Sequence, residues 1–254
     1  GEPACQGACP FHAIRRDENG NIEIDQQACT GCSLCVDACK AQKLTQSKDI
    51  LPVLDVVAKQ DAPVYALIAP AFVSQFSERV TPGRLRSAFK ALGFAGMVEV
   101  ALFADILTLK AALDFDELVR SEEDFLLTSC CCPIWIAMIR KVYGSLTPHI
   151  PASVSPMIAC GRAVKQLVPG AVTVFIGPCV AKKAEAREAD IADAVDFVLT
   201  FQEIQDVFDF AGVDPENMKE DLRDHSSRAG RIYAHTGGVS EAVKTPLERP
   251  RPGR

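Results

Sequence analysis

Six cysteines near the start of the chain have the spacing of iron–sulfur ligands, namely Cys5, Cys9, Cys29, Cys32, Cys35 and Cys39. The last four form the run C-x2-C-x2-C-x3-C, in which three thiolates bind one cluster and the fourth binds a neighbouring cluster. The first two, followed by Pro10, match the second half of another such run. By this crossover rule, Cys9 is expected to complete a [4Fe–4S] cluster with Cys29, Cys32 and Cys35.

A second cluster would take Cys5 and Cys39 together with two cysteines that would lie before Gly1. A zinc site built from paired C-x2-C elements is the alternative interpretation, and the triple spacing favours iron–sulfur ligation. Residues 1–47 resemble a bacterial two-cluster ferredoxin domain whose beginning is missing, so we expect a small α+β fold for them. A segment this short buries too little apolar surface to fold without metal or disulfide support.

Two further cysteine-containing loops lie in the remainder of the chain. Residues 128–135 read TSCCCPIW, and residues 177–185 read GPCVAKKAE. Each loop follows a short apolar run that predicts a strand, and the first also precedes a predicted helix. Because open α/β sheets bind ligands beyond the carboxyl ends of their strands, we expect the sulfur atoms of these two loops to converge on one site.

Residues 48–254 alternate short apolar runs with amphipathic segments of helical length. This pattern predicts an α/β domain, a parallel sheet covered by helices. The expected strands are residues 64–69, 97–100, 125–129, 172–177 and 195–200. The expected helices are residues 84–92, a segment that ends at Leu113, and residues 133–143, 156–168 and 202–211.

The composition excludes several classes of protein. The chain carries 27 basic and 33 acidic side chains, a net charge of −6, which argues against nucleic-acid binding because phosphate contacts need a basic face. It has no apolar stretch of 18 or more residues, so we expect no membrane span and no membrane partner. Nothing in the sequence resembles an export leader, and with so many ligand-spaced thiols a cytoplasmic location is expected.

The two loops resemble those of the [FeFe]-hydrogenase family, including its proposed hydrogen-sensing branch. That family carries a TSCCPxW loop and an MPCxxKxxE loop, and both are present here with small departures. Residues 68–70, Ile-Ala-Pro, also match the turn after the family's first strand. A third family loop, ExMxCxxGCxxGG, is not found after Gly238. The resemblance therefore implies a hydrogenase-type fragment that lacks both of its ends.

The resemblance implies a six-iron site, a [4Fe–4S] cubane joined by a thiolate to a two-iron unit with CO and cyanide. Cys132 and Cys179 would be cubane ligands. The catalytic group would comprise Cys131 as the first proton carrier, Lys182 as a donor to cyanide, and Asp114 and Ser155 as proton steps. Cofactor contacts would come from Ala69, Pro70, Trp135, Pro178 and Glu185, with backbone amides near the first two holding a cyanide, Trp135 walling the pocket and Glu185 orienting its loop.

The chain departs from the family pattern at several positions. Three consecutive cysteines replace the usual two, so the cubane ligand is Cys132 if Pro133 sets the register and Cys131 if Thr128 does; we favour the proline. Gly177 stands where catalytic members have Met. Lys110 and the residue after it occupy positions where carboxylates are expected, which should slow proton transfer.

These departures favour a slow or sensory member over a fast producer of hydrogen. Only two of four cubane ligands are present, so the chain alone is expected to be inactive. The expected partners are H2, protons, ferredoxin or another redox partner, and hydrogenase maturation proteins. Two alternatives to a catalytic hydrogenase remain, hydrogen sensing and a non-catalytic iron–sulfur assembly scaffold. Cys160 is expected to be a packed core thiol, and Gly161 to permit close helix–sheet approach.

Overall fold

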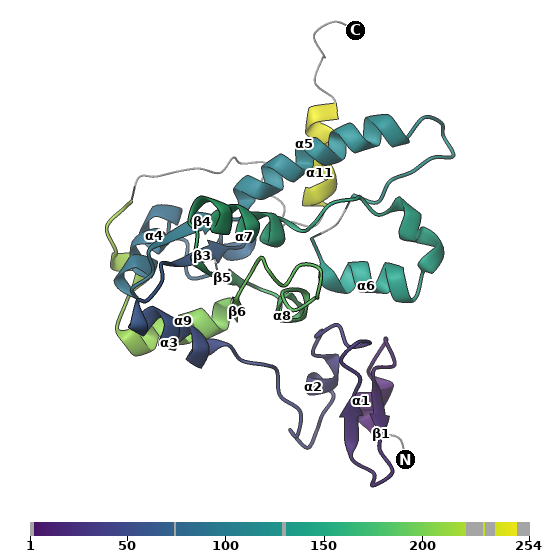
Figure 1. The fold of residues 1–254 in the computed structure, drawn as a ribbon, viewed down its shortest axis with the longest axis horizontal. Helices are drawn as coiled ribbons and strands as arrows, with labels where there is room; N and C mark the ends of the chain where they lie inside the picture. Colours follow the sequence, from purple (N-terminus) through teal and green to yellow (C-terminus); the bar gives the residue numbers. More distant parts are fainter. Residues whose placement is uncertain (1–2, 74, 129–130, 222–230, 232–236, 248–254) are drawn as a thin grey trace, which may run out of the picture.

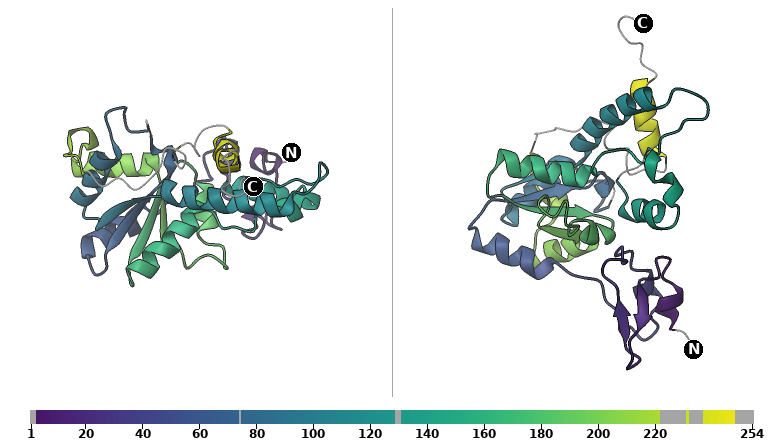
Figure 2. Two further views of the ribbon diagram at one scale, coloured as in Figure 1. Left: turned by 90° about the horizontal axis from the view of Figure 1, so that it is seen from above. Right: turned by 45° about the vertical axis from the view of Figure 1, so that its right-hand side comes forward.

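The structure is a computed structural model, and it describes residues 3–73, 75–128, 131–221, 231 and 237–247. An N-terminal module extends to about residue 47, and an α/β domain follows it. In Figures 1 and 2 the module lies beside helix α6 (Pro133–Lys141) of the larger domain, and the segment that leads into helix α3 (Ile50–Lys59) joins the two parts. None of the described helices combines the length and apolar character needed to cross a membrane.

The N-terminal module is built from one hairpin and two helical turns. Strands β1 (Ile14–Arg16) and β2 (Ile22–Ile24) are antiparallel. Their turn is stabilised by Asp17, whose Oδ1 accepts hydrogen bonds from the backbone N–H groups of Asn19 and Asn21 at 2.9 and 2.7 Å. Helices α1 (Ala4–Gly7) and α2 (Leu34–Asp37) complete the module. This is the small α+β architecture that the sequence predicts.

The larger domain is organised around a four-stranded parallel sheet with the order β4-β3-β5-β6. Its strands are β3 (Val64–Ile68), β4 (Gly96–Glu99), β5 (Val172–Gly177) and β6 (Phe197–Thr200). Short apolar runs suit a parallel sheet because helices bury both of its faces. Ile68 pairs with Glu99 on one side and Ile176 on the other, so neighbouring strands end at one edge.

Helices cover both faces of the sheet. Helix α7 (Pro156–Leu167) packs on β3 and β5, while α3 (Ile50–Lys59) and α9 (Phe201–Ala211) lie on the opposite side in Figure 1. Helix α4 (Pro82–Ala91) shares its core with α9, since the rings of Phe89 and Phe208 lie 5.4 Å apart. The predicted fold class, a parallel sheet covered by helices, is confirmed.

The remaining helical elements surround the edge at which the strands end. They are η1 (Pro70–Phe72), α5 (Ala101–Leu118), α6 (Pro133–Lys141), η2 (Gly144–His149), α8 (Ala181–Glu185), η3 (Pro215–Asn217) and α11 (Gly238–Leu247). Helix α11 packs along α5, as Figure 1 shows. Gly237, just before α11, has a φ of 74°, the left-handed conformation that glycine adopts without strain.

The predicted strand at residues 125–129 is wrong. Its described part, residues 125–128, belongs to no strand, and its backbone instead meets η2, because the N–H of Leu127 donates to the carbonyl of His149 at 2.8 Å. The Phe125 ring stacks on His149 with centroids 3.9 Å apart. A short apolar run predicts an extended backbone, and periodicity alone cannot say whether it joins the sheet.

Two smaller predictions are confirmed in the core. Cys160 is fully buried in α7, and burial raises the pKa of its thiol far above the ordinary value. Gly161 lies so close to the chain at Ala194 that an added Cβ would sit 2.2 Å from the carbonyl oxygen of that residue. Glycine at this position therefore permits the close approach of α7 to the segment that leads into β6.

Candidate iron–sulfur sites

A cavity of about 190 Å³ opens at the carboxyl edge of the sheet. Cys131, Cys132 and Cys179 all line it, together with Lys182. The two cysteine loops, far apart in the sequence, therefore meet at one small cavity. This convergence is the geometric condition that a shared inorganic centre requires.

Local backbone structure explains where each of these thiols lies. Cys132 is the N-cap of α6, with Pro133 at the first helical position, where proline is favoured because no N–H is needed there. Cys179 comes two residues after the end of β5 and two before α8. Both thiols are half-buried. Ser129 and Cys130, the preceding residues of the first loop, lie outside the described residues.

Lys182 lines this cavity, and its ammonium pairs with Glu185. Both side chains are about nine-tenths buried, and Nζ of Lys182 donates to Oε2 of Glu185 at 2.5 Å, one turn along α8. Charge-assisted hydrogen bonds of this kind are strong and directional. Glu185 therefore orients the ammonium of Lys182, a more specific arrangement than the loop-orienting role expected from sequence.

Ala69 and Pro70 line the cavity, but neither of these two residues has an N–H to offer a ligand there. The N–H of Ala69 already donates to the carbonyl of Ile176 at 2.8 Å, as the continuation of the β3–β5 ladder. Pro70 has no N–H. Both residues therefore offer apolar wall atoms, and the next residue, Ala71, also borders the cavity. Pro178 lines the cavity as well.

The space beside Gly177 is filled by an aromatic ring. A Cβ on Gly177 would lie 2.6 Å from the ring of Phe175, which points to the same face of β5 two residues earlier and lines the cavity. A methionine could not be placed at position 177 without moving this ring. The glycine that replaces the family's methionine at position 177 is thus accompanied by Phe175, whose ring fills the space beside it.

Three residues expected at this site are placed elsewhere. Trp135 is 40% exposed and does not line this cavity, because it lies on a face of α6 that the rest of the domain leaves open. Asp114 lies on α5, where its carboxylate pairs with Lys110 at 2.6 Å. Ser155 is the N-cap of α7, its Oγ accepting from the N–H of Ile158 at 3.5 Å, and it borders a different cavity.

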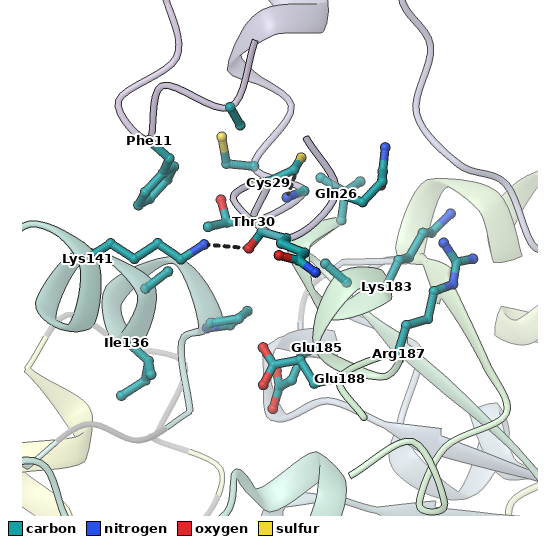
Figure 3. Close-up of a pocket in the computed structure, with 18 of the residues that line it drawn as sticks. Phe11, Gln26, Cys29, Thr30, Ile136, Lys141, Lys183, Glu185, Arg187 and Glu188 are labelled. Carbon is teal, nitrogen blue, oxygen red and sulfur yellow. Dashed lines mark hydrogen bonds between the residues drawn. The ribbon is translucent and has the colours of Figure 1, made fainter. Parts of the chain in front are cut away.

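That second cavity, of about 1020 Å³, lies between the N-terminal module and the larger domain (Figure 3). It is lined by the four cysteines that the crossover rule assigns to one cluster, Cys9, Cys29, Cys32 and Cys35. The other two cysteines of the module do not line it. Burial, with the charges of the thiolates at 29 and 32, raises the pKa of Cys35. The spacing rule and the cavity therefore select the same four thiols.

Backbone amides point at several of the module's sulfur atoms. Sγ of Cys9 accepts from Ala13 N–H at 3.4 Å, and Sγ of Cys29 from Gly31 N–H at 3.5 Å. N–H groups, first that of Lys43, lower the pKa of Cys39 below the ordinary thiol value. Hydrogen bonds to sulfur are among the means by which proteins stabilise iron–sulfur clusters.

A buried hydroxyl lies beside the cysteines of the large cavity. Thr30 Oγ1, next to Cys29, has no hydrogen-bond partner among the described residues, and it borders the same cavity. A hydroxyl in that position can donate to a cluster sulfur. Within the described ranges, no three His, Cys, Asp or Glu side chains are close enough to share one metal ion.

Acidic groups line the opposite wall of the large cavity. Glu185 and Glu188 lie near one another in Figure 3. Burial, reinforced by the charges of Glu185 and Asp190, raises the pKa of Glu188. Glu188 therefore takes up a proton at a higher pH than an exposed glutamate does.

A parallel α/β domain with a thiol-lined cavity at its strand ends, beside a cysteine-rich α+β module, defines an iron–sulfur redox protein. The family model of the iron-only hydrogenase large subunit, C-terminal domain, matches residues 62–250. The chain belongs to this [FeFe]-hydrogenase family, which confirms the resemblance drawn from its loops.

Individual relatives agree with this assignment. The chain is 30% identical, over 182 residues, to the periplasmic [Fe] hydrogenase large subunit of Nitratidesulfovibrio vulgaris, covering 65% of this chain and 43% of that protein. It is 27% identical to the NADP-reducing hydrogenase subunit HndD of Solidesulfovibrio fructosivorans, covering 87% and 43%. The [FeFe]-hydrogenase HydA1 of Chlamydomonas reinhardtii superposes with a TM-score of 0.63 at 26% identity, covering 81% and 60%. The chain thus spans under half the length of these two curated relatives.

Proposed function

We propose that this chain is the electron-entry and cofactor-binding part of a hydrogenase-type protein that interconverts H2 with protons and electrons. The observation that carries the proposal is the convergence of Cys132 and Cys179 on one cavity, with a second thiol-lined cavity at the module. Cys9, Cys29, Cys32 and Cys35 would hold one [4Fe–4S] cluster, and Cys5 and Cys39 would contribute to another.

At the smaller cavity, Cys132 and Cys179 would supply two of the thiolates of a six-iron cofactor. When bound, this cofactor supplies the heterolytic cleavage of H2 and the storage of electrons. Because a cubane takes four thiolates, the proposal for H2 chemistry concerns the protein in which two further cysteines complete the set.

The chain's own residues would then manage protons and orientation. Cys131 lines the cavity beside Cys132, and a thiol can both donate and accept a proton at Sγ. Lys182 would direct its ammonium into the cavity while Glu185 holds it in place. Pro70, Pro178 and Phe175 would exclude water and keep the site in a low-dielectric environment.

Hydrogen sensing is a second candidate, and two features favour it. Phe175 fills the space beside Gly177, where catalytic members of the family have Met. Asp114 is paired with Lys110, so this carboxylate is committed to an ion pair. The ion pair favours slow proton transfer, and the change at position 177 removes a side chain that catalytic members place against the cofactor. We also propose that the protein is cytoplasmic. It would exchange electrons with ferredoxin or another redox partner and would need hydrogenase maturation proteins.

Anaerobic reconstitution of the chain with iron and sulfide tests the cluster proposal. We expect at least four irons per chain and the electron paramagnetic resonance signal of a reduced [4Fe–4S] cluster. Cys32→Ala should lose one cluster, and Cys160→Ala, which removes a buried core thiol, should keep it. Equal iron binding by Cys32→Ala and the parent chain would rule the assignment out.

For H2 chemistry, hydrogen–deuterium exchange by the longer, matured protein is the decisive assay. Fast exchange supports the catalytic proposal, slow exchange supports the sensory one, and infrared spectra without bands of metal-bound CO and cyanide would contradict both.

A further inference from the structure

Lys141 joins the larger domain to the cysteine loop of the N-terminal module. Its Nζ donates to the carbonyl oxygens of Gln27 and Ala28, at 3.1 and 2.8 Å, and these peptide groups directly precede Cys29. The dashed line at Lys141 in Figure 3 marks one of these two hydrogen bonds. The same ammonium lies 5.9 Å from the centre of the Phe11 ring, also in the module. One lysine thus contacts the module at two places, the ring of Phe11 and the loop that precedes Cys29.

Lys141 is the last residue of α6, the helix that runs between the two cavities. Helix α6 begins directly after Cys132, in the smaller cavity, and ends at Lys141 beside Cys29. Nine helical residues span about 13 Å at 1.5 Å per residue. A single short helix therefore connects the two proposed cluster sites, and its last residue is fixed to the loop of the second site. A cation at the C-terminal end of a helix is also stabilised by the helix dipole.

The charge of Lys141 acts on whatever Cys29 binds. A cluster gains one negative charge on reduction, so a nearby cation stabilises the reduced form and raises the reduction potential. Other charged groups also line this cavity: Arg140, Lys183, Arg187, Glu185 and Glu188. Lys141 differs from them in a specific way, because its ammonium is hydrogen-bonded to the peptide groups next to the ligating residue.

We propose that Lys141 is a positioning residue that docks the module onto the larger domain and raises the reduction potential of the cluster held by Cys29 and its neighbours. This inference rests on the proposed function, since it requires that the cluster is bound. By this inference, one side chain holds the two proposed sites together and also sets part of the difference between their reduction potentials.

A redox titration of the reconstituted full chain, followed by electron paramagnetic resonance, tests the inference. Lys141→Met should bind the same amount of iron as the parent chain, with its reduction equilibrium constant lowered about three- to tenfold, a negative shift of about 28–59 mV for one electron. Lys141→Arg keeps the charge and should restore most of the potential. Lys59→Met removes an exposed lysine at the far end of α3 and should leave the potential unchanged.

Docking has its own readout. Proteolysis in the connecting segment, residues 40–48, should be faster in Lys141→Met than in Lys59→Met. If Lys141→Met binds no iron, Lys141→Gln replaces it in the titration, because glutamine removes the charge and keeps a hydrogen-bond donor.

A fully loaded Lys141→Met or Lys141→Gln chain with an unchanged potential overturns the inference and leaves the proposed clusters intact. Failure of the parent chain to bind iron overturns the proposed function, and this inference with it.

Discussion

Replacing Lys183 by methionine is expected to destabilise the larger domain strongly. Its ammonium makes three hydrogen bonds, to Oε1 and Oε2 of Glu203 at 2.7 and 2.9 Å and to the carbonyl of Ser47 at 2.7 Å. The side chains of Lys183 and Glu203 are only 4% and 10% exposed. The pair is therefore largely shielded from water, which compensates poorly for a lost partner.

The magnitude follows from the group that is left behind. Without Lys183, the carboxylate of Glu203 keeps its capping hydrogen bond from Thr200 N–H at 2.8 Å but remains buried without its counter-charge. Breaking one side of a buried ion pair typically costs about 3–5 kcal/mol. The loss also leaves Ser47, in the segment between the module and α3, with only the hydrogen bond from Arg187 to its Oγ at 3.1 Å, so we expect faster proteolysis there.

Urea unfolding at pH 7, followed by circular dichroism, measures this cost. Glu203→Gln keeps an acceptor for the helix cap and removes the negative charge. The double variant should therefore lose less stability than the two single variants added together, by at least about 1 kcal/mol. The exposed pair of Lys59 and Asp55 provides the control, and Lys59→Met should leave the free energy of unfolding nearly unchanged, because water solvates both groups. A loss below about 1 kcal/mol for Lys183→Met, or strictly additive single variants, would refute this reasoning.

Two further predictions follow from local geometry. Gly161→Ala should cost about 1–3 kcal/mol by overpacking in urea unfolding, whereas Gly144→Ala, where a Cβ meets nothing within 4 Å, should be nearly neutral; equal losses would contradict the close approach. Cys160 should resist alkylation at pH 8 until urea unfolds the chain, since burial keeps its thiol protonated, and labelling of the folded protein would show that α7 opens.

Local sequence patterns predicted the secondary structure well where an element is continuous and apolar. The strands β3 and β5 and the helices α6, α7 and α9 lie within a few residues of their expected positions. Residues 125–128 failed because their apolar side chains met η2 and not the sheet, a choice that depends on distant residues such as His149. Trp135 failed for a similar reason, since helical periodicity does not say which face of α6 finds a neighbour.

The residues that sequence reasoning missed act through contacts across the chain. Phe175 fills the space beside Gly177, and Lys141 holds the loop before Cys29. Neither residue belongs to a motif. The adjacent bulky and small residues on one face of β5 were the available signal for the first, and the second had none.

By itself, the sequence determined which thiols of the N-terminal segment could act together. Cysteines a few residues apart stay close in space however the rest of the chain folds. Only the tertiary structure decided that Cys132 and Cys179 share one cavity, that Ala69 has already used its N–H in the sheet, and that Asp114 is paired with Lys110. The physical reason is that convergence, hydrogen-bond competition and ion pairing depend on distances through space, which the sheet order and the packing of helices set.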